Sequence, residues 1–307
     1  MSDQFHRDMA AGYRLWASSY AAKSTSKAKA GLLALAQAHD DEAARLTPPP
    51  PAPNPASPPD GGLSATVPSL VYARRVKFTA GVQGDAELIT EQLDGSDSRR
   101  EFRNVQFDVG DWFGIVTDQQ EPYLFVNCTF DGSSADRATR SPIGAVIPQG
   151  SFIDCEFRGL DNFARVGGGS LLAGCWGHSP IASPGSHVDG VEVSTGTGIR
   201  FVNCWLEIPT NADTGSPAQI GATAALNIAP DFGPIDDVDI DSCVLLGGGM
   251  PLLIRQQGPG HLSNIRVRNT ILDGGRWGPV NTDGVAKQAI TEWTDVTTLD
   301  GTPIPKP

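Results

Sequence analysis

The stretch FVNCWL at residues 201–206 is one of seven copies of a six-residue phrase that recurs along the chain. The other six copies are FRNVQF at 102–107, FVNCTF at 125–130, FIDCEF at 152–157, LAGCWG at 172–177, IDSCVL at 240–245 and VRNTIL at 267–272. Successive copies start 20 to 39 residues apart. A repeat period in this range is typical of solenoids, propellers and other stacked architectures.

The third position of the phrase predicts a corner between two strands. Positions 1 and 4 are apolar or small, although alternate side chains of one straight strand would point to opposite faces. A bend between them lets both side chains enter one core. Every copy has Asn, Asp, Gly or Ser at position 3, and these residues tolerate the left-handed and turn conformations that a sharp corner needs. The repeated unit of strand, one-residue corner and strand therefore predicts a mainly β protein, a parallel β-helix.

Composition and charge exclude several classes of protein. The chain has 307 residues with 35 glycines and 24 prolines, which suits short strands joined by tight turns. Its net charge of −12 argues against nucleic-acid binding, because phosphate contacts need a basic surface. No apolar stretch is long enough for a membrane span, and the first residues lack the pattern of a secretory signal. We expect a protein that folds in a cytoplasm.

The five cysteines all fall at position 4 of the phrase: Cys128, Cys155, Cys175, Cys204 and Cys243. Because position 4 is expected to face the core, we predict small, buried, reduced side chains stacked from coil to coil. No pair or cluster of these cysteines has the spacing of a zinc site. We therefore expect no metal and no cofactor.

The chain is expected to divide into four segments. They are a helical arm or anchor at 1–46, a proline-rich linker at 47–62, a parallel β-helix with irregular end coils at 63–296, and a C-terminal tail at 297–307. Apolar residues at three- and four-residue steps from Phe5 to Trp16 predict an amphipathic helix in the arm. This helix could cap the body or anchor the chain to another protein. The linker favours anchoring, because a polyproline tract is a stiff, extended spacer.

Outward positions of the phrase supply the first candidate site. Position 5 holds Glu156, Trp176 and Trp205 in successive copies, so stacked coils would place them in a ladder. Aromatic faces beside a carboxylate suit the binding of sugar rings. The alternative is that loops cover these tryptophans.

Position 2 of the phrase forms a second outward row, which is apolar. Either an oligomer seam or a packed insertion would explain it. This row is Val126, Ile153 and Val202.

A second candidate site precedes the phrase at 201–206 by one strand. His187, Asp189 and Glu192 lie close together in the sequence. Two carboxylates and a histidine could perform acid–base or glycosidic chemistry. The alternative is a turn in which His187 and Asp189 bond to the main chain and Gly190 takes a positive φ.

Several short segments carry a resemblance to a known superfamily. They are HVDGV at 187–191, the Asn-Cys corners, LGG at 246–248 and LDGG at 272–275. Over roughly residues 100–275 the chain resembles the pectate-lyase-like superfamily, whose fold is a single-stranded right-handed parallel β-helix. It is most similar to the β-helix proteins of actinobacteria and their phages, many of which are virion proteins.

This resemblance, together with the arm and spacer, implies a phage virion protein. It would be a fibre-like or spike-like appendage of the tail or head, anchored to other virion proteins through residues 1–46. The β-helix would contact host-surface polysaccharide. The alternative is a polysaccharide hydrolase or lyase that uses Asp189, Glu192 and His187. Viral β-helices are often trimers, so a homo-oligomer is expected, with a trimer favoured.

Overall fold

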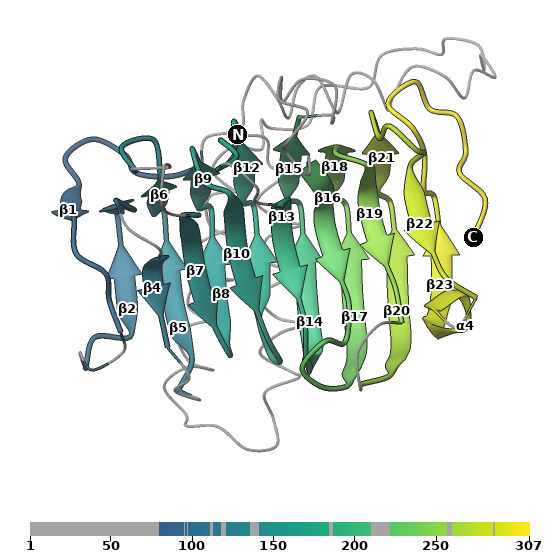
Figure 1. Cartoon of the computed structure of the whole chain (residues 1–307), viewed down its shortest axis with the longest axis horizontal. Coiled ribbons are helices and arrows are strands. Elements are labelled where there is room, and N and C mark those ends of the chain that lie inside the picture. The colour runs from purple at the N-terminus through teal and green to yellow at the C-terminus, as the bar shows by residue number, and fades with distance from the viewer. Residues whose placement is uncertain are drawn as a thin grey trace, which may run out of the picture. The chain divides into compact units, whose positions relative to one another are not determined.

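A computed structural model of the protein describes residues 80–307, except 95, 97, 111–112, 118–120, 136–140, 184–186, 210–221, 257–259 and 285. The predicted helical arm and proline-rich linker lie outside the described residues. Within the described part, nearly all regular structure is β, arranged as three sheets that run side by side along the body (Figure 1).

The three sheets, here named A, B and C, take their strands in turn from the chain. Sheet A contains β1 (Glu87–Ile89), β3 (Val105–Asp108), β6 (Thr129–Asp131), β9 (Glu156–Arg158), β12 (Trp176–His178), β15 (Trp205–Ile208), β18 (Val244–Gly247) and β21 (Ile271–Asp273). Sheet B contains β4 (Phe113–Val116), β7 (Ile143–Ile147), β10 (Asn162–Val166), β13 (Val188–Val193), β16 (Ala222–Ile228), β19 (Met250–Ile254) and β22 (Val280–Thr282). Sheet C contains β2 (Glu101–Arg103), β5 (Tyr123–Val126), β8 (Gly150–Ile153), β11 (Leu171–Ala173), β14 (Gly196–Val202), β17 (Ile235–Asp241), β20 (Leu262–Arg268) and β23 (Ile290–Thr294).

Each coil passes through sheet C, then A, then B, and returns to C one level further along the body. Strand pairing is parallel between successive coils in all three sheets, for example β8 with β11 and β13 with β16. This arrangement is a parallel β-helix and confirms the fold predicted from the repeated phrase.

The corner between sheets C and A lies at position 3 of the phrase, as the parity of the pattern predicts. All seven residues at this position have a positive φ between 48° and 64°. They are Asn104, Asn127, Asp154, Gly174, Asn203, Ser242 and Asn269. Asparagine and glycine reach this left-handed region at low cost, which explains why the phrase admits so few residue types there.

Positions 1, 4 and 6 fill the core. Phe152, at position 1, is fully buried and stacks on Phe125 at 4.8 Å, while Phe130 stacks on Phe157, both at position 6, at 5.0 Å. The five cysteines are free and buried, which confirms their predicted placement. Loss of hydration raises the pKa of the Cys204 thiol well above its usual value, so this thiol stays protonated.

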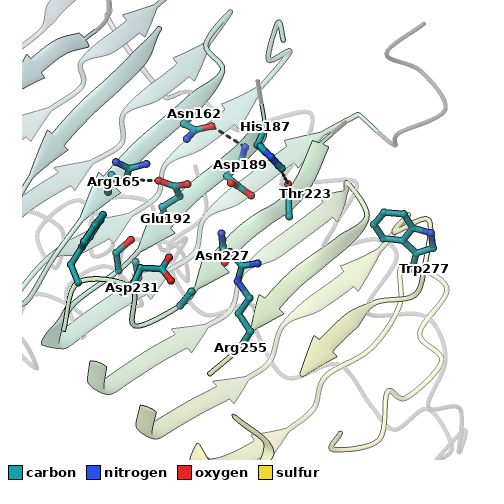
Figure 2. Close-up of a pocket in the computed structure, with 14 residues that line it drawn as sticks. Asn162, Arg165, His187, Asp189, Glu192, Thr223, Asn227, Asp231, Arg255 and Trp277 are labelled. Atoms are coloured by element: carbon teal, nitrogen blue, oxygen red, sulfur yellow. Dashed lines mark hydrogen bonds and ion pairs between the residues drawn. The ribbon is translucent and has the colours of Figure 1, made fainter. Parts of the chain in front are cut away.

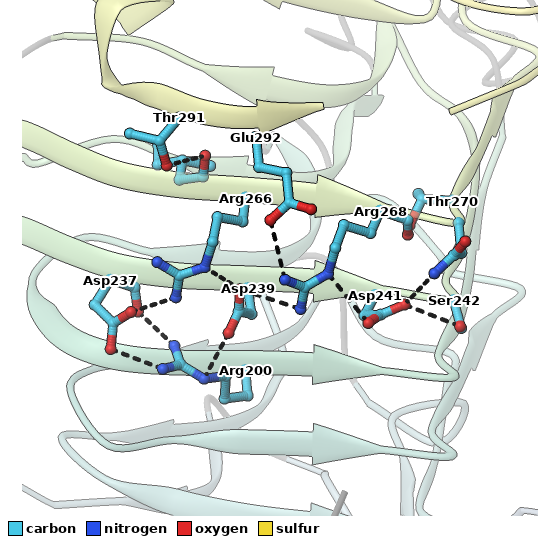
Figure 3. A network of polar contacts seen from close by, with 12 residues as sticks. Arg200, Asp237, Asp239, Asp241, Ser242, Arg266, Arg268, Thr270, Thr291 and Glu292 are labelled. Atoms are coloured by element: carbon cyan, nitrogen blue, oxygen red, sulfur yellow. Dashed lines mark hydrogen bonds and ion pairs between the residues drawn. The ribbon is translucent and has the colours of Figure 1, made fainter. Parts of the chain in front are cut away.

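The outer face of sheet C carries a ladder of ion pairs in its C-terminal half (Figure 3). Arg200 of β14 contacts Asp239 of β17 at 2.9 Å, and Arg266 of β20 contacts the same carboxylate at 2.5 Å. Opposite charges therefore alternate across neighbouring strands, which avoids the repulsion of stacked like charges. On the next strand, β23, the Glu292 carboxylate accepts a hydrogen bond from Arg268 of β20.

The C-terminal residues pack onto the last coil. The short helix α4 (Ala286–Ala289) precedes β23, and Trp293 Nε1 donates to the Ile304 carbonyl oxygen at 2.8 Å. Leu299 packs against an apolar cluster on the outer face of sheet A that includes Ile271. The end of the solenoid core is thereby shielded from water.

Candidate functional site

A groove of about 560 Å³ lies on sheet B, and all three sequence-predicted acid–base residues line it (Figure 2). Strands β10, β13 and β16 and the residue after β19 supply its floor, while loops beyond the strand ends form its two rims. The lining residues used below are Asn162, Arg165, His187, Asp189, Glu192, Thr223, Asn227, Asp231, Phe232, Arg255 and Trp277.

Strand β13 brings Asp189 and Glu192 into the groove. The main-chain N–H of Asp189 donates to Asn162 Oδ1 at 2.9 Å, which fixes β13 against β10. A Cβ on Gly190 would lie 2.1 Å from the Ala225 carbonyl oxygen, so the close approach of β16 requires glycine there. Gly190 belongs to a strand and has no positive φ, so the expectation of a turn at this position is wrong.

Asp189 is the most unusual carboxyl of the groove. The residue is only 5% exposed, and its Oδ1 has no hydrogen-bond partner among the described residues. Loss of hydration raises the pKa of Asp189 to about 8, and the charge of Glu192 and a hydrogen bond to that carboxylate add to the effect. Arg255 opposes the shift without cancelling it. At neutral pH this carboxyl is therefore mainly protonated and can donate a proton.

Glu192 has the opposite electrostatic environment. Arg165, on the neighbouring strand β10, donates to its carboxylate through Nε. The two residues are register partners across the β10–β13 ladder, so the pairing is built into the sheet. One carboxyl of the pair is thus buried with a raised pKa, and the other is ion-paired with an arginine.

Two further polar groups point to a ligand. Asn227 Oδ1 of β16 and Arg255 Nε, just after β19, are buried and have no hydrogen-bond partner among the described residues. Unpaired buried polar atoms are costly, and such atoms at the floor of a groove can be satisfied by a bound molecule. Neither residue was predicted from the sequence, since each lies on a different coil from Asp189.

Exposed aromatic side chains stand at both rims. Trp277 is 65% exposed, and its ring packs over Gly249, where a Cβ would lie 2.4 Å from the ring. Phe232 is 71% exposed, in the loop that follows β16. The main-chain N–H of Trp277 donates a hydrogen bond to the carbonyl oxygen of Gly249, just before β19. The main-chain N–H of Phe232 donates to the carbonyl oxygen of Ser194, just after β13. The two rings therefore mark opposite edges of sheet B.

His187 lies at the rim rather than between the carboxyls. It is exposed, and its Nδ1 lies 3.4 Å from the Thr223 hydroxyl. The structure brings all three sequence-predicted residues to one groove, but places only Asp189 and Glu192 in direct interaction.

The predicted ladder of Glu156, Trp176 and Trp205 forms in the expected register, with Trp176 paired to both neighbours. It lies on sheet A, away from the groove on sheet B. Glu156 is 8% exposed and Trp205 is 3% exposed, so these two residues offer no open platform for a sugar ring. Gly81 packs against Glu156, and Trp205 belongs to a buried apolar cluster. These contacts favour the alternative in which the row is covered.

The outward apolar row on sheet C is also largely covered. Val126 and Ile153 are register partners and are 7% and 1% exposed, while Val202 is half-buried. Because the first two are buried within a single chain, they do not form an open seam for a second copy.

No group of three or more His, Cys, Asp or Glu side chains among the described residues is arranged to hold a metal ion. None of the described helices is long and apolar enough to cross a membrane.

Comparison with known protein families finds no matching family model, and comparisons with curated proteins and with solved structures find no match either.

Proposed function

We propose that the groove on sheet B binds a polysaccharide and cleaves its glycosidic bonds by acid–base catalysis. The observation that carries this proposal is the buried Asp189, whose pKa is raised to about 8, beside Glu192, which is paired with Arg165. Glycosidic cleavage needs an acid that remains protonated near neutral pH, because the leaving sugar oxygen must receive a proton.

The roles of the carboxyls follow from their surroundings. Asp189 gives its proton to the glycosidic oxygen as the bond to the anomeric carbon breaks. Burial keeps the pKa of that acid high, and the neighbouring Glu192, which accepts a hydrogen bond from Arg165, adds to the effect. Asp231, an exposed carboxylate from the loop after β16, lines the same groove and is available to take a proton from the attacking water.

The rest of the groove suits a sugar polymer. Trp277 and Phe232 offer flat apolar faces at its two edges, and the floor between them is polar. The groove runs along β16, which has seven residues, so its edges lie roughly 20 Å apart at about 3.3 Å per residue. Several sugar rings fit in this length, and Asn227 and Arg255 can bond to their hydroxyl or acidic groups.

The test is incubation of the full chain with bacterial capsular polysaccharide and with purified cell-wall glycan. New reducing ends indicate hydrolysis, whereas unsaturated ends indicate a lyase. Asp189→Asn should remove the activity, Glu192→Gln should reduce it and move its pH profile downward, and Asp300→Asn, an exposed change in the C-terminal tail, should leave it unchanged. Equal cleavage by the parent and Asp189→Asn would remove the basis for this assignment.

We also propose that this β-helix is a phage virion appendage whose residues 1–46 attach it to other virion proteins. The support is the sequence layout of apolar-striped arm, proline-rich spacer and β-helix, together with the resemblance described above. Homo-oligomerisation, with a trimer favoured, belongs to the same proposal. If residues 47–307 assemble onto particles as well as the full chain, the arm is not the anchor. Light scattering on the full chain tests the oligomer.

A further inference from the structure

A second constellation of catalytic residue types lies on sheet A, outside the groove. His178, at the end of β12, stands between two hydrogen-bond partners: its Nδ1 is 3.0 Å from Ser179 Oγ and its Nε2 is 3.0 Å from Glu156 Oε1. A hydroxyl, an imidazole and a carboxylate joined in this order are the parts of a nucleophile, its base and the group that orients the base.

Glu156 is held as an anion, which fixes the tautomer of His178. Burial raises the pKa of Glu156, but the hydrogen bond from His178 and the charge of Arg158 outweigh that effect, and the pKa is lowered. Thr129 Oγ1 donates to the same carboxylate at 3.0 Å. An ionised carboxylate only accepts hydrogen bonds, so His178 Nε2 must carry the proton. In the neutral ring, Nδ1 is then the acceptor for the Ser179 hydroxyl.

The His178 ring is held in place by packing as well. Trp176 stacks on it with ring centroids 3.8 Å apart and an interplanar angle of 23°. His178 pairs in register with Arg158 and lies one coil beyond Glu156. Neighbouring strands of a rigid sheet therefore set the distance between base and carboxylate, which is the precision that a catalytic hydrogen bond requires.

Ser179 is exposed, so a substrate can reach its hydroxyl. Its φ is 48°, close to the 56° of Ser242 at a corner of the coil, and its carbonyl oxygen is held by the Gly159 N–H at 3.1 Å. The main chain therefore fixes the position of this serine. Ile181, two residues further on, is 42% exposed and offers an apolar contact for an acyl group.

We propose that Ser179, His178 and Glu156 form a serine esterase site that hydrolyses short-chain carboxylic esters. Ser179 Oγ bonds to the ester carbonyl carbon as its proton passes to His178 Nδ1. The bond from that carbon to the alcohol oxygen then breaks, and the alcohol leaves with the proton. Water attacks the acyl-serine and gives its proton to Nδ1, the carboxylic acid departs, and the proton returns to Ser179. Glu156 acts through His178 and is a positioning residue.

The test uses the full chain with p-nitrophenyl acetate and, separately, with a fluorophosphonate probe. The parent protein should hydrolyse the ester and carry the probe on Ser179, as identified by peptide mass spectrometry. Ser179→Ala should lose labelling and lower the hydrolysis rate by on the order of 100-fold. Ser134→Ala, which removes another exposed serine hydroxyl, is the matched control and should behave as the parent.

Two further variants separate catalysis from folding. Ser179→Gly fits the positive φ and should be at least as stable as the parent, yet it should be inactive. Glu156→Gln should lower kcat with KM unchanged, because it releases the tautomer of His178 without altering the surface that the ester touches. The proposal is overturned if the probe does not label Ser179, or if Ser179→Ala and Ser179→Gly hydrolyse the ester as fast as the parent.

Discussion

Replacement of Asp189 by Asn tests the electrostatics of the groove on sheet B most sharply. In the parent protein, loss of hydration and the Glu192 carboxylate raise the pKa of Asp189 to about 8. Asn has nearly the same shape, is always neutral and can still donate to Glu192 as the protonated acid does. The substitution should therefore leave the low-pH protein little changed and stabilise the high-pH protein.

The size of the effect follows from linkage between protonation and folding. Because the pKa of Asp189 in the folded protein lies above the unfolded value of 3.8, ionisation of this carboxyl costs more free energy in the folded state than in the unfolded state. Folding is therefore least favourable when the carboxyl is ionised. The penalty begins as the pH rises above about 4, grows through the neutral range and is complete above about pH 8. At about 1.4 kcal/mol for each pH unit, Asp189→Asn should gain roughly 4 kcal/mol relative to the parent between about pH 5 and pH 9.

Urea unfolding of both proteins at about pH 5 and pH 9 measures this difference, and an unchanged slope confirms that the same structure unfolds. Asp231→Asn is the matched control, because it removes an exposed carboxylate from the same groove. Its stability should follow that of the parent at both pH values. If Asp189→Asn tracks the parent as the control does, Asp189 is ionised in the folded protein and the assignment of a proton donor is refuted.

Six other substitutions, at five positions, test the fold and the groove. Asp154→Asn should stabilise the protein by about 2–4 kcal/mol above pH 7, because burial raises the pKa of this half-buried corner residue to about 7; urea midpoints on either side of that pH check it. Asn203→Ala should cost about 1–2 kcal/mol in the same assay because φ is 53°, whereas glycine there should be nearly neutral. Phe152→Ala should cost about 3–5 kcal/mol of unfolding free energy, since its ring is fully buried. Trp277→Ala and Phe232→Ala should each weaken polysaccharide binding by about 3–10-fold in equilibrium binding assays, with unchanged thermal unfolding.

The sequence predicts the coil of this fold well because its corner imposes a strict local constraint. A left-handed residue is needed once in each coil, and few side chains tolerate it, so Asn203 and its counterparts recur visibly. Cys204 follows for the same reason, since the parity of the corner directs it into the core. Both constraints act within one strand and the turn that follows it, so a short stretch of sequence is enough to predict them.

Exposure of outward residues was not predictable in this way. Trp205 and Glu156 do point away from the core, yet both are buried by segments distant in the sequence, and Gly81 lies against Glu156. The pattern within a strand sets which face a side chain takes. The pattern within a strand does not show which other segments cover that face. The residues predicted to bind a sugar ring are therefore largely covered in the structure.

Only some of the residues that line the groove could be predicted from the sequence. Asp189 and Glu192 attract attention because they are neighbours along one strand. Their partners Arg165, Asn227 and Arg255 come from other coils, and coil lengths vary with the insertions between strands. Arg165, Glu192 and Asn227 share one row of the sheet, a relation that only the strand register reveals.

Carboxyl-carbon NMR titration measures directly whether Asp189 keeps its proton at neutral pH, as the proposed acid–base site requires. Full-length protein labelled with carbon-13 at aspartate side chains would be compared with the Asp189→Asn variant, which identifies the resonance by its loss. We predict that this resonance titrates near pH 8, well above those of exposed aspartates. If the resonance that disappears in the variant titrates near pH 4 instead, Asp189 is an ordinary carboxylate and the proposed acid–base site does not exist.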